Sequence, residues 1–178
     1  MIERATNIIA AVQHLIGIER KPRTVKWFTP EVRKSLKEKD FWICQIEAKS
    51  ISQLISEGML FAAHTNWPED FLNHKPIPMM VAINPRQPFS KNSHKGIKGV
   101  RGTELTAPAI CQLEFKYFKE TGENLIKKAF VRTKSRIYKR SVVVIGRYDN
   151  NDPLTALAFY RKSSDPRLCA LEVVISRV

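Results

Sequence analysis

The chain is poor in the residues that build disulfide frameworks and metal sites. It has 178 residues, of which only three are cysteines and four are histidines. The cysteines, Cys44, Cys111 and Cys169, are widely spaced and flanked by apolar residues, which predicts buried free thiols rather than disulfides or zinc ligands. The histidines stand singly, without an HExxH pattern. We therefore expect no metal and no cofactor, and an intracellular, reducing compartment, the cytoplasm or the nucleus.

Long hydrophobic runs are missing as well. Runs such as Met79–Ile83 and Val142–Ile145 are far shorter than the roughly 20 apolar residues that cross a bilayer. The segment Ile8–Ile18 is interrupted by polar residues and is followed by no cleavage-site pattern, so we do not expect it to be a signal peptide. With 43% hydrophobic and 26% charged residues, the composition predicts one basic globular domain over residues 1–178, without a transmembrane segment.

Acidic residues are absent from two long stretches. None occurs between Asp70 and Glu104, and none occurs between Glu123 and Asp149. Residues 71–147 therefore hold 16 lysines and arginines against four carboxylates, a net charge of +12 out of the +13 of the whole chain. Such segregation of charge predicts a polyanionic partner, either nucleic acid or an anionic membrane surface.

The apolar pattern changes along the chain from helical to strand-like, which predicts an α+β fold. The N-terminal half is expected to be mostly helical with short strands: helices over 5–16, from Pro30, from Ile51 and over 69–73, and strands over 24–28, 41–48, 59–63 and 79–83. Another helix is expected to begin at Thr106–Pro108 and to end at Gly122. The C-terminal part predicts an antiparallel meander: strands over 128–133, 136–148 and 168–175, with 154–161 fitting a strand or a helix.

The expected core consists of residues on the apolar faces of these elements. They are Trp42, Cys44, Ile46, Ile110, Leu113, Val143, Ile145, Leu171, Val173 and Ile175.

The segment Lys127–Arg140 is the strongest candidate for a binding surface. Arg132, Lys134 and Arg136 occur at every second position, so on an extended strand they would share a face with Phe130. Cations interleaved with aromatic rings can contact phosphates and stack on bases. The expected contacts are Lys127, Lys128, Arg132, Lys134, Arg136, Lys139 and Arg140.

Residues 84–102 predict a long, flexible, basic loop, because proline, glycine, serine and asparagine are dense there. Three of its glycines recur at every third residue, each directly after a cation. These pairs are Lys95–Gly96, Lys98–Gly99 and Arg101–Gly102. The spacing matches neither a P-loop nor a dinucleotide fingerprint, so we expect a clamp on phosphates rather than a nucleotide pocket.

A metal-dependent nuclease is the catalytic alternative. Glu114-Phe115-Lys116 has the ExK spacing of the PD-(D/E)xK type, in which both side chains address one metal-bound water, and Glu104 would be the upstream ligand. However, this segment predicts a helix, which would turn Glu114 and Lys116 apart. We therefore expect no catalytic residue and favour a non-catalytic nucleic-acid-binding protein.

A structural protein is the other alternative. A compact basic chain of this size also suits a matrix-like or nucleocapsid-associated assembly protein of a virus or mobile element, which would self-associate and bridge nucleoprotein to an anionic membrane. Whether the nucleic acid is DNA or RNA is left open by the sequence, because no motif of a specific recognition module occurs.

Overall fold

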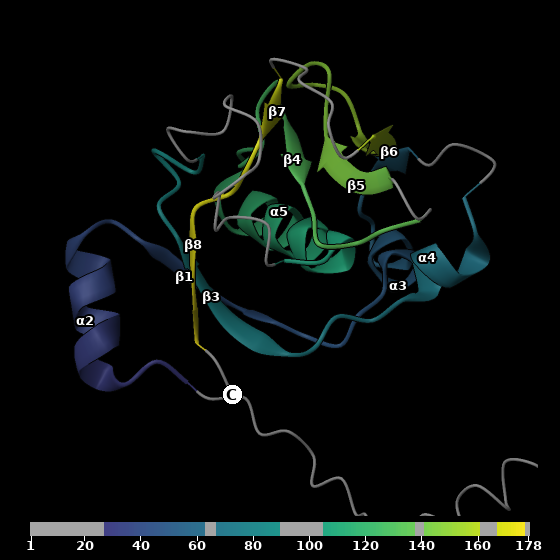
Figure 1. Ribbon diagram of the computed structural model, residues 1–178. Helices are drawn as coiled ribbons and strands as arrows, with labels where there is room; N and C mark the ends of the chain where they lie inside the picture. Colours follow the sequence, from purple (N-terminus) through teal and green to yellow (C-terminus); the bar gives the residue numbers. More distant parts are fainter. Residues whose placement is uncertain (1–26, 63–66, 90–104, 138–140, 161–166, 177–178) are drawn as a thin grey trace, which may run out of the picture.

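The computed structural model describes residues 27–62, 67–89, 105–137, 141–160 and 167–176 (Figure 1). Its elements follow the order α2 (Pro30–Glu38), β1 (Trp42–Ile46), α3 (Ile51–Ser56), β2 (Phe61–Ala62), α4 (Glu69–Asn73), β3 (Met79–Ile83), α5 (Ala107–Thr121), β4 (Phe130–Arg132), β5 (Ser141–Gly146), β6 (Leu154–Tyr160), β7 (Leu168–Cys169) and β8 (Val173–Ser176). The α+β fold expected from the sequence is confirmed, and the ambiguous segment after Pro153 is a strand.

The strands form two sheets. Sheet A is antiparallel with the order β1-β3-β8, and sheet B has the order β2-β6-β5-β4-β7. Within sheet B, β4, β5 and β6 form an antiparallel meander, as expected. The strand expected over 168–175 is divided, because β7 pairs with β4 in parallel and β8 belongs to sheet A. Strand β2 pairs with β6 in parallel at the other edge, so sheet B is mixed. The chain passes from sheet B to sheet A where β7 runs into β8, at the yellow end of the ribbon (Figure 1).

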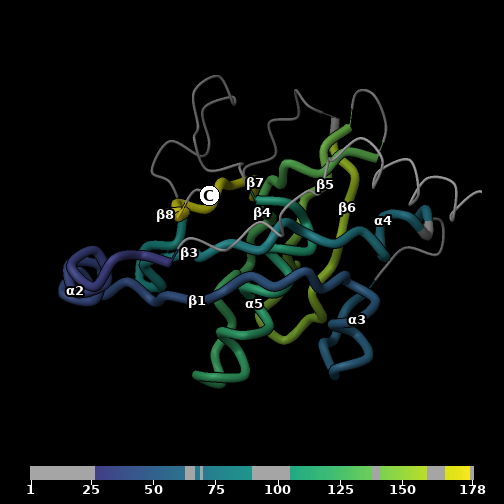
Figure 2. Tube along the Cα trace, turned by 90° about the horizontal axis from the view of Figure 1, so that it is seen from below, coloured from purple at the N-terminus to yellow at the C-terminus, as the bar shows by residue number. Residues whose placement is uncertain are grey.

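Helix α5 lies between the two sheets (Figures 1 and 2). It contacts both β1 and β5, and every residue from Ala107 to Phe115 is buried. The first nine residues of the helix are buried on all sides, so apolar residues occur on more than one of its faces, and the two buried polar residues, Gln112 and Glu114, are hydrogen-bonded. Phe118, near the C-terminal end of the helix, is exposed. The helix begins after Thr106 and ends at Gly122, whose φ of 75° is left-handed, as predicted.

The other face of sheet A is covered in part by α2. Thr29 is the N-cap of this helix and proline occupies its first turn, as expected. Phe28 and Leu36 pack against Met80 and Ala82 of β3. Val32 is exposed, and Leu36 is the buried residue of α2.

Other local predictions are confirmed. The helix expected from Ile51 is α3, and Ser50 and Gln53 form a capping box at its start. Seven of the ten expected core residues are buried, and Trp42, Val173 and Ile175 are partly buried. All three cysteines are free and buried.

Some predictions fall outside the described residues, namely the helix over 5–16 and residues 90–104 of the basic loop. Of the strand expected over 24–28, only Trp27 and Phe28 are described, and they are not in a strand. Among the helices that the structure describes, none has the length and apolar character needed to cross a membrane.

Candidate nucleic-acid interface

The basic residues predicted to form one surface are divided between the two ends of α5. Lys127 and Lys128 follow the C-terminal end of the helix, whereas Lys134 and Arg136 lie beside its N-terminal end, beyond β4. The helix has 15 residues and is therefore about 22 Å long. The remaining predicted contacts, Lys95, Lys98, Arg101, Lys139 and Arg140, lie outside the described residues.

Arg132 does not belong to an exposed surface. All three residues of β4 are buried, and Arg132 is only 7% exposed. The cause is the position of β4 between β5 and β7, with Phe130 packed in one apolar cluster and Val131 in another. This burial lowers the pKa of the Arg132 guanidinium. The prediction that Arg132 shares an exposed face with Lys134 and Arg136 is therefore wrong.

Lys127 and Lys128 are exposed, but each has a carboxylate partner. The Nζ atom of Lys127 lies 3.1 Å from Oε2 of Glu123. The Nζ atom of Lys128 lies 3.5 Å from Oδ1 of Asp149. The carboxylates of Glu123 and Asp149 thus balance the charges of Lys127 and Lys128. This end of the molecule therefore lacks the excess of positive charge that the segment Lys127–Arg140 indicates in the sequence.

A cleft with a volume of about 470 Å³ lies beside the N-terminus of α5, and we call it the Lys134 cleft. Lys134 and Arg136 are exposed on its wall, and within the described part of the chain no carboxylate forms an ion pair with either. One acid, Asp70, also lines the cleft. The full lining is Pro68, Asp70, Phe71, His74, Thr106, Pro108, Lys134, Ser135, Arg136 and Ile137.

Hydrogen bonds fix the segment after β4 against the start of α5. The backbone N–H of Lys134 donates to the carbonyl of Leu105 at 2.8 Å. The N–H of Ala107, the first residue of the helix, donates to Oγ of Ser135 at 2.9 Å. On the other side, the N–H of Val143 donates to the carbonyl of Ser135 at 3.0 Å. The two cations are therefore carried by a positioned segment, next to the positive end of a helix dipole.

Two further basic segments are joined to this cleft by the chain itself. Residues 90–104 lead directly into Leu105, and residues 138–140 directly follow Ile137. Arg101 and Lys139 consequently stand within a few residues of the cleft lining. The basic residues of these two segments are therefore close to the cleft lining in sequence.

The ExK residues are directed to different sheets. Oε2 of Glu114 accepts a hydrogen bond from the backbone N–H of Ile126 at 2.9 Å, and Oε1 accepts one from Arg147, the residue after the central strand β5 of sheet B. Nζ of Lys116 instead lies 2.7 Å from Oε1 of Glu47, beside sheet A. Two positions apart on a helix differ by about 200°, so the side chains cannot address one water. Among the residues described, no cluster of three His, Cys, Asp or Glu is placed to hold a metal, and the geometry gives the nuclease no support.

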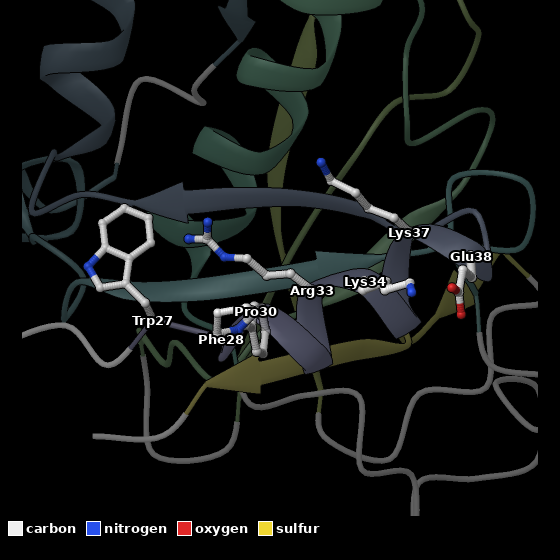
Figure 3. Close-up of a pocket in the computed structure, with 7 residues that line it drawn as sticks. All are labelled: Trp27, Phe28, Pro30, Arg33, Lys34, Lys37 and Glu38. Carbon is white, nitrogen blue, oxygen red and sulfur yellow. The ribbon is translucent and has the colours of Figure 1, made fainter.

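A second surface was missed by the sequence reasoning. Figure 3 shows the indole of Trp27 beside α2, with the side chain of Arg33 directed toward it. The guanidinium carbon lies 5.1 Å from the ring centroid. This open groove of about 850 Å³, which we call the Trp27 groove, is lined by Trp27, Phe28, Pro30, Arg33, Lys34, Lys37 and Glu38. The available signal was an aromatic residue just before a helix with cations at i, i+1 and i+4.

Comparisons with known proteins do not place the chain in a family. No family model, no curated protein and no solved structure matches it. The geometry of the two surfaces is therefore the basis for the function proposed below.

Proposed function

We propose that this protein binds nucleic acid through phosphate groups, without catalysis, and that the Lys134 cleft is the principal contact. The observation that supports this most is the placement of Lys134 and Arg136 beside the start of α5 without a carboxylate partner among the described residues. The cations Lys95, Lys98, Arg101, Lys139 and Arg140 lie outside the described residues and stay predicted contacts of the same proposal.

The chemistry of the cleft suits phosphate. Arg136 offers a planar fork that binds two phosphate oxygens, and Lys134 offers a compact charge. Ser135 lies between them and holds the segment through its contact with Ala107. Asp70 repels phosphate, so contacts are expected on the wall that carries Lys134 and Arg136, away from α4. Nothing in this arrangement reads base edges, and we expect little sequence preference.

The test is a salt titration of binding to single- and double-stranded DNA and RNA. Four or five phosphate contacts predict a slope of log K against log salt of about −4 for duplex DNA. The variant Lys134→Gln/Arg136→Gln should have a slope shallower by about two units. The matched control is Lys127→Gln/Lys128→Gln, which removes the same charge at the other end of α5, where Glu123 and Asp149 already balance it. Its slope should change by less than about half a unit.

Two outcomes would contradict the proposal. If the slope of log K against log salt becomes shallower by the same amount in both double variants, binding depends on the overall charge and not on a particular site. If the wild-type protein binds anionic phospholipid vesicles but no nucleic acid, and self-associates on them, the matrix-like assembly protein becomes the better description.

A further inference from the structure

Trp27 takes no part in the apolar cluster that packs α2 against sheet A. Phe28 and Leu36 make the contacts that hold this helix on sheet A. Trp27 directly precedes Phe28 in the chain, but it is 55% exposed. Leaving the largest apolar side chain in water is costly, and an exposed aromatic residue among charges is typical of a binding site.

The surroundings of the indole are basic. Arg33, Lys34 and Lys37 line the groove against one carboxylate, Glu38. Arg33 stacks near one face of the Trp27 ring, and more than half of the residue remains open to a ligand (Figure 3). A flat aromatic surface beside cations is the combination that proteins use to stack unpaired bases and hold their phosphates.

We propose that the Trp27 groove is a stacking site for an unpaired base of single-stranded nucleic acid, with Lys34 and Lys37 contacting the adjoining phosphates. The inference rests on the proposed function and adds the class of partner. In a duplex the faces of the bases are covered by their neighbours, so only a single strand, a loop or an end can present a base to Trp27.

A membrane surface fits this groove less well. A helix that lies in a lipid interface needs a broad apolar face for insertion. The apolar face of α2 is already used, because Leu36 packs on sheet A. The groove carries Lys34, Lys37 and Glu38, and of its two aromatic rings Trp27 is exposed whereas Phe28 is buried.

The two surfaces lie at opposite sides of the molecule, since α2 and α4 are at opposite ends of sheet A in both views (Figures 1 and 2). The Lys134 cleft is lined partly by residues of α4, including Asp70 and Phe71. A strand of about four nucleotides should occupy one surface at a time, whereas one of about 16 nucleotides can engage both. A strand that engages both surfaces should then bind more tightly than a strand that engages only one of them.

The experiment uses the fluorescence of the full chain, which contains three tryptophans. Single-stranded oligonucleotide should quench the wild-type emission by stacking on Trp27. Trp27→Phe should remove most of that quenching while it retains binding, and Trp27→Ala should weaken single-strand binding by about 5- to 150-fold. Duplex affinity should be unchanged in both variants.

Phe118→Ala is the matched control, since Phe118 is also an exposed aromatic side chain but lies on α5. It should leave both quenching and affinity unchanged. A circular dichroism melt shows whether each variant is folded. Because Trp27 is exposed, both Trp27 variants should melt at the wild-type temperature.

The results separate the two proposals. If Trp27→Ala binds single strands as tightly as wild type, or loses duplex and single-strand affinity equally, the stacking site is wrong, while the Lys134 cleft is still judged by its own variant. If anionic vesicles shift the emission of Trp27 to the blue and oligonucleotides do not quench it, the groove binds lipid and the inference is overturned.

Discussion

Glu114 in the middle of α5 and Arg147, the residue after β5, form a buried ion pair. Nη1 of Arg147 also donates to the carbonyl of Asp152 at 2.8 Å, and Oε2 of Glu114 accepts from the N–H of Ile126 at 2.9 Å. Burial raises the pKa of Glu114, whereas Arg147 and Ile126 favour its ionised form. The pair thus joins the central helix to the segment before β4 and to the turn between β5 and β6.

The first prediction concerns this pair. Glu114→Ala should destabilise the fold by about 3–5 kcal/mol, because the Arg147 guanidinium would be left buried without a counter-charge. Chemical denaturation measures this loss as a lower midpoint. Glu123→Ala is the control, since it removes an exposed partner of Lys127 and should cost less than about 1 kcal/mol. Equal stability of the two variants would show that the buried pair has no special role.

The second prediction concerns the centre of the core. Leu113 is fully buried on α5 between the sheets. Leu113→Ala should lower the free energy of unfolding by about 2–5 kcal/mol, through lost burial and the cavity left behind. Val32→Ala, on the exposed side of α2, should stay within about 0.5 kcal/mol of wild type. Wild-type stability of the Leu113 variant would mean that α5 is not the centre of the core.

The parts of the fold that the sequence predicted are those set by local chemistry. Thr29, Ser50 and Gly122 act within one helical turn of their own positions, so a cap or a left-handed residue is readable from its neighbours. The enclosure of α5 was not readable, because it depends on two sheets built from segments on both sides of it. The mixed pairing of sheet B likewise depends on β2 and β7, which are distant in sequence from the strands they join.

The candidate site was predicted in composition but not in arrangement. The spacing of Arg132 with Lys134 fits an exposed strand, yet Arg132 is buried, and β4 lies inside sheet B because β7, more than 30 residues further along, pairs with it. Lys127 and Lys134 look continuous in sequence, but β4 carries the chain from one end of α5 toward the other. The exposure of Trp27 could not be predicted, because it depends on which of the two neighbouring aromatic residues packs on sheet A, and that residue is Phe28.

The third prediction concerns Gly146, the last residue of β5. A Cβ atom at this position would lie 2.0 Å from the carbonyl oxygen of Ala129, so the two backbones can approach only because no side chain intervenes. The N–H of Arg147 donates to that same oxygen at 3.1 Å, which fixes the approach. Gly146→Ala should therefore destabilise the fold by about 1–3 kcal/mol, measured by thermal melting.

Gly122→Ala is a useful comparison, because a Cβ there meets nothing within 4 Å but the φ of 75° is unfavourable for alanine. It should also destabilise, by about 1 kcal/mol, for a conformational reason alone. Gly122→Asn should recover part of that loss, since asparagine tolerates the left-handed region. Gly146→Asn should destabilise the fold more than Gly146→Ala, because the effect at this position is a steric clash that grows with the side chain. The opposite order at Gly146 would show that the close approach of β5 to Ala129 is mistaken.

The last prediction concerns the thiols. Burial raises the pKa of Cys44 and of Cys169 to about 12, and it raises the pKa of Cys111 as well. Thiolate is the reactive form, so at pH 8 almost none is present and the sulfur atoms are also covered. A thiol reagent such as dithionitrobenzoate should therefore react with none of the three in the native protein at pH 8, and with all three in denaturant. Reaction in native buffer should proceed only through unfolding, so Leu113→Ala should accelerate it equally at every cysteine. Fast modification of one cysteine in the stable wild-type chain would contradict the burial of that thiol and would place its element at the surface.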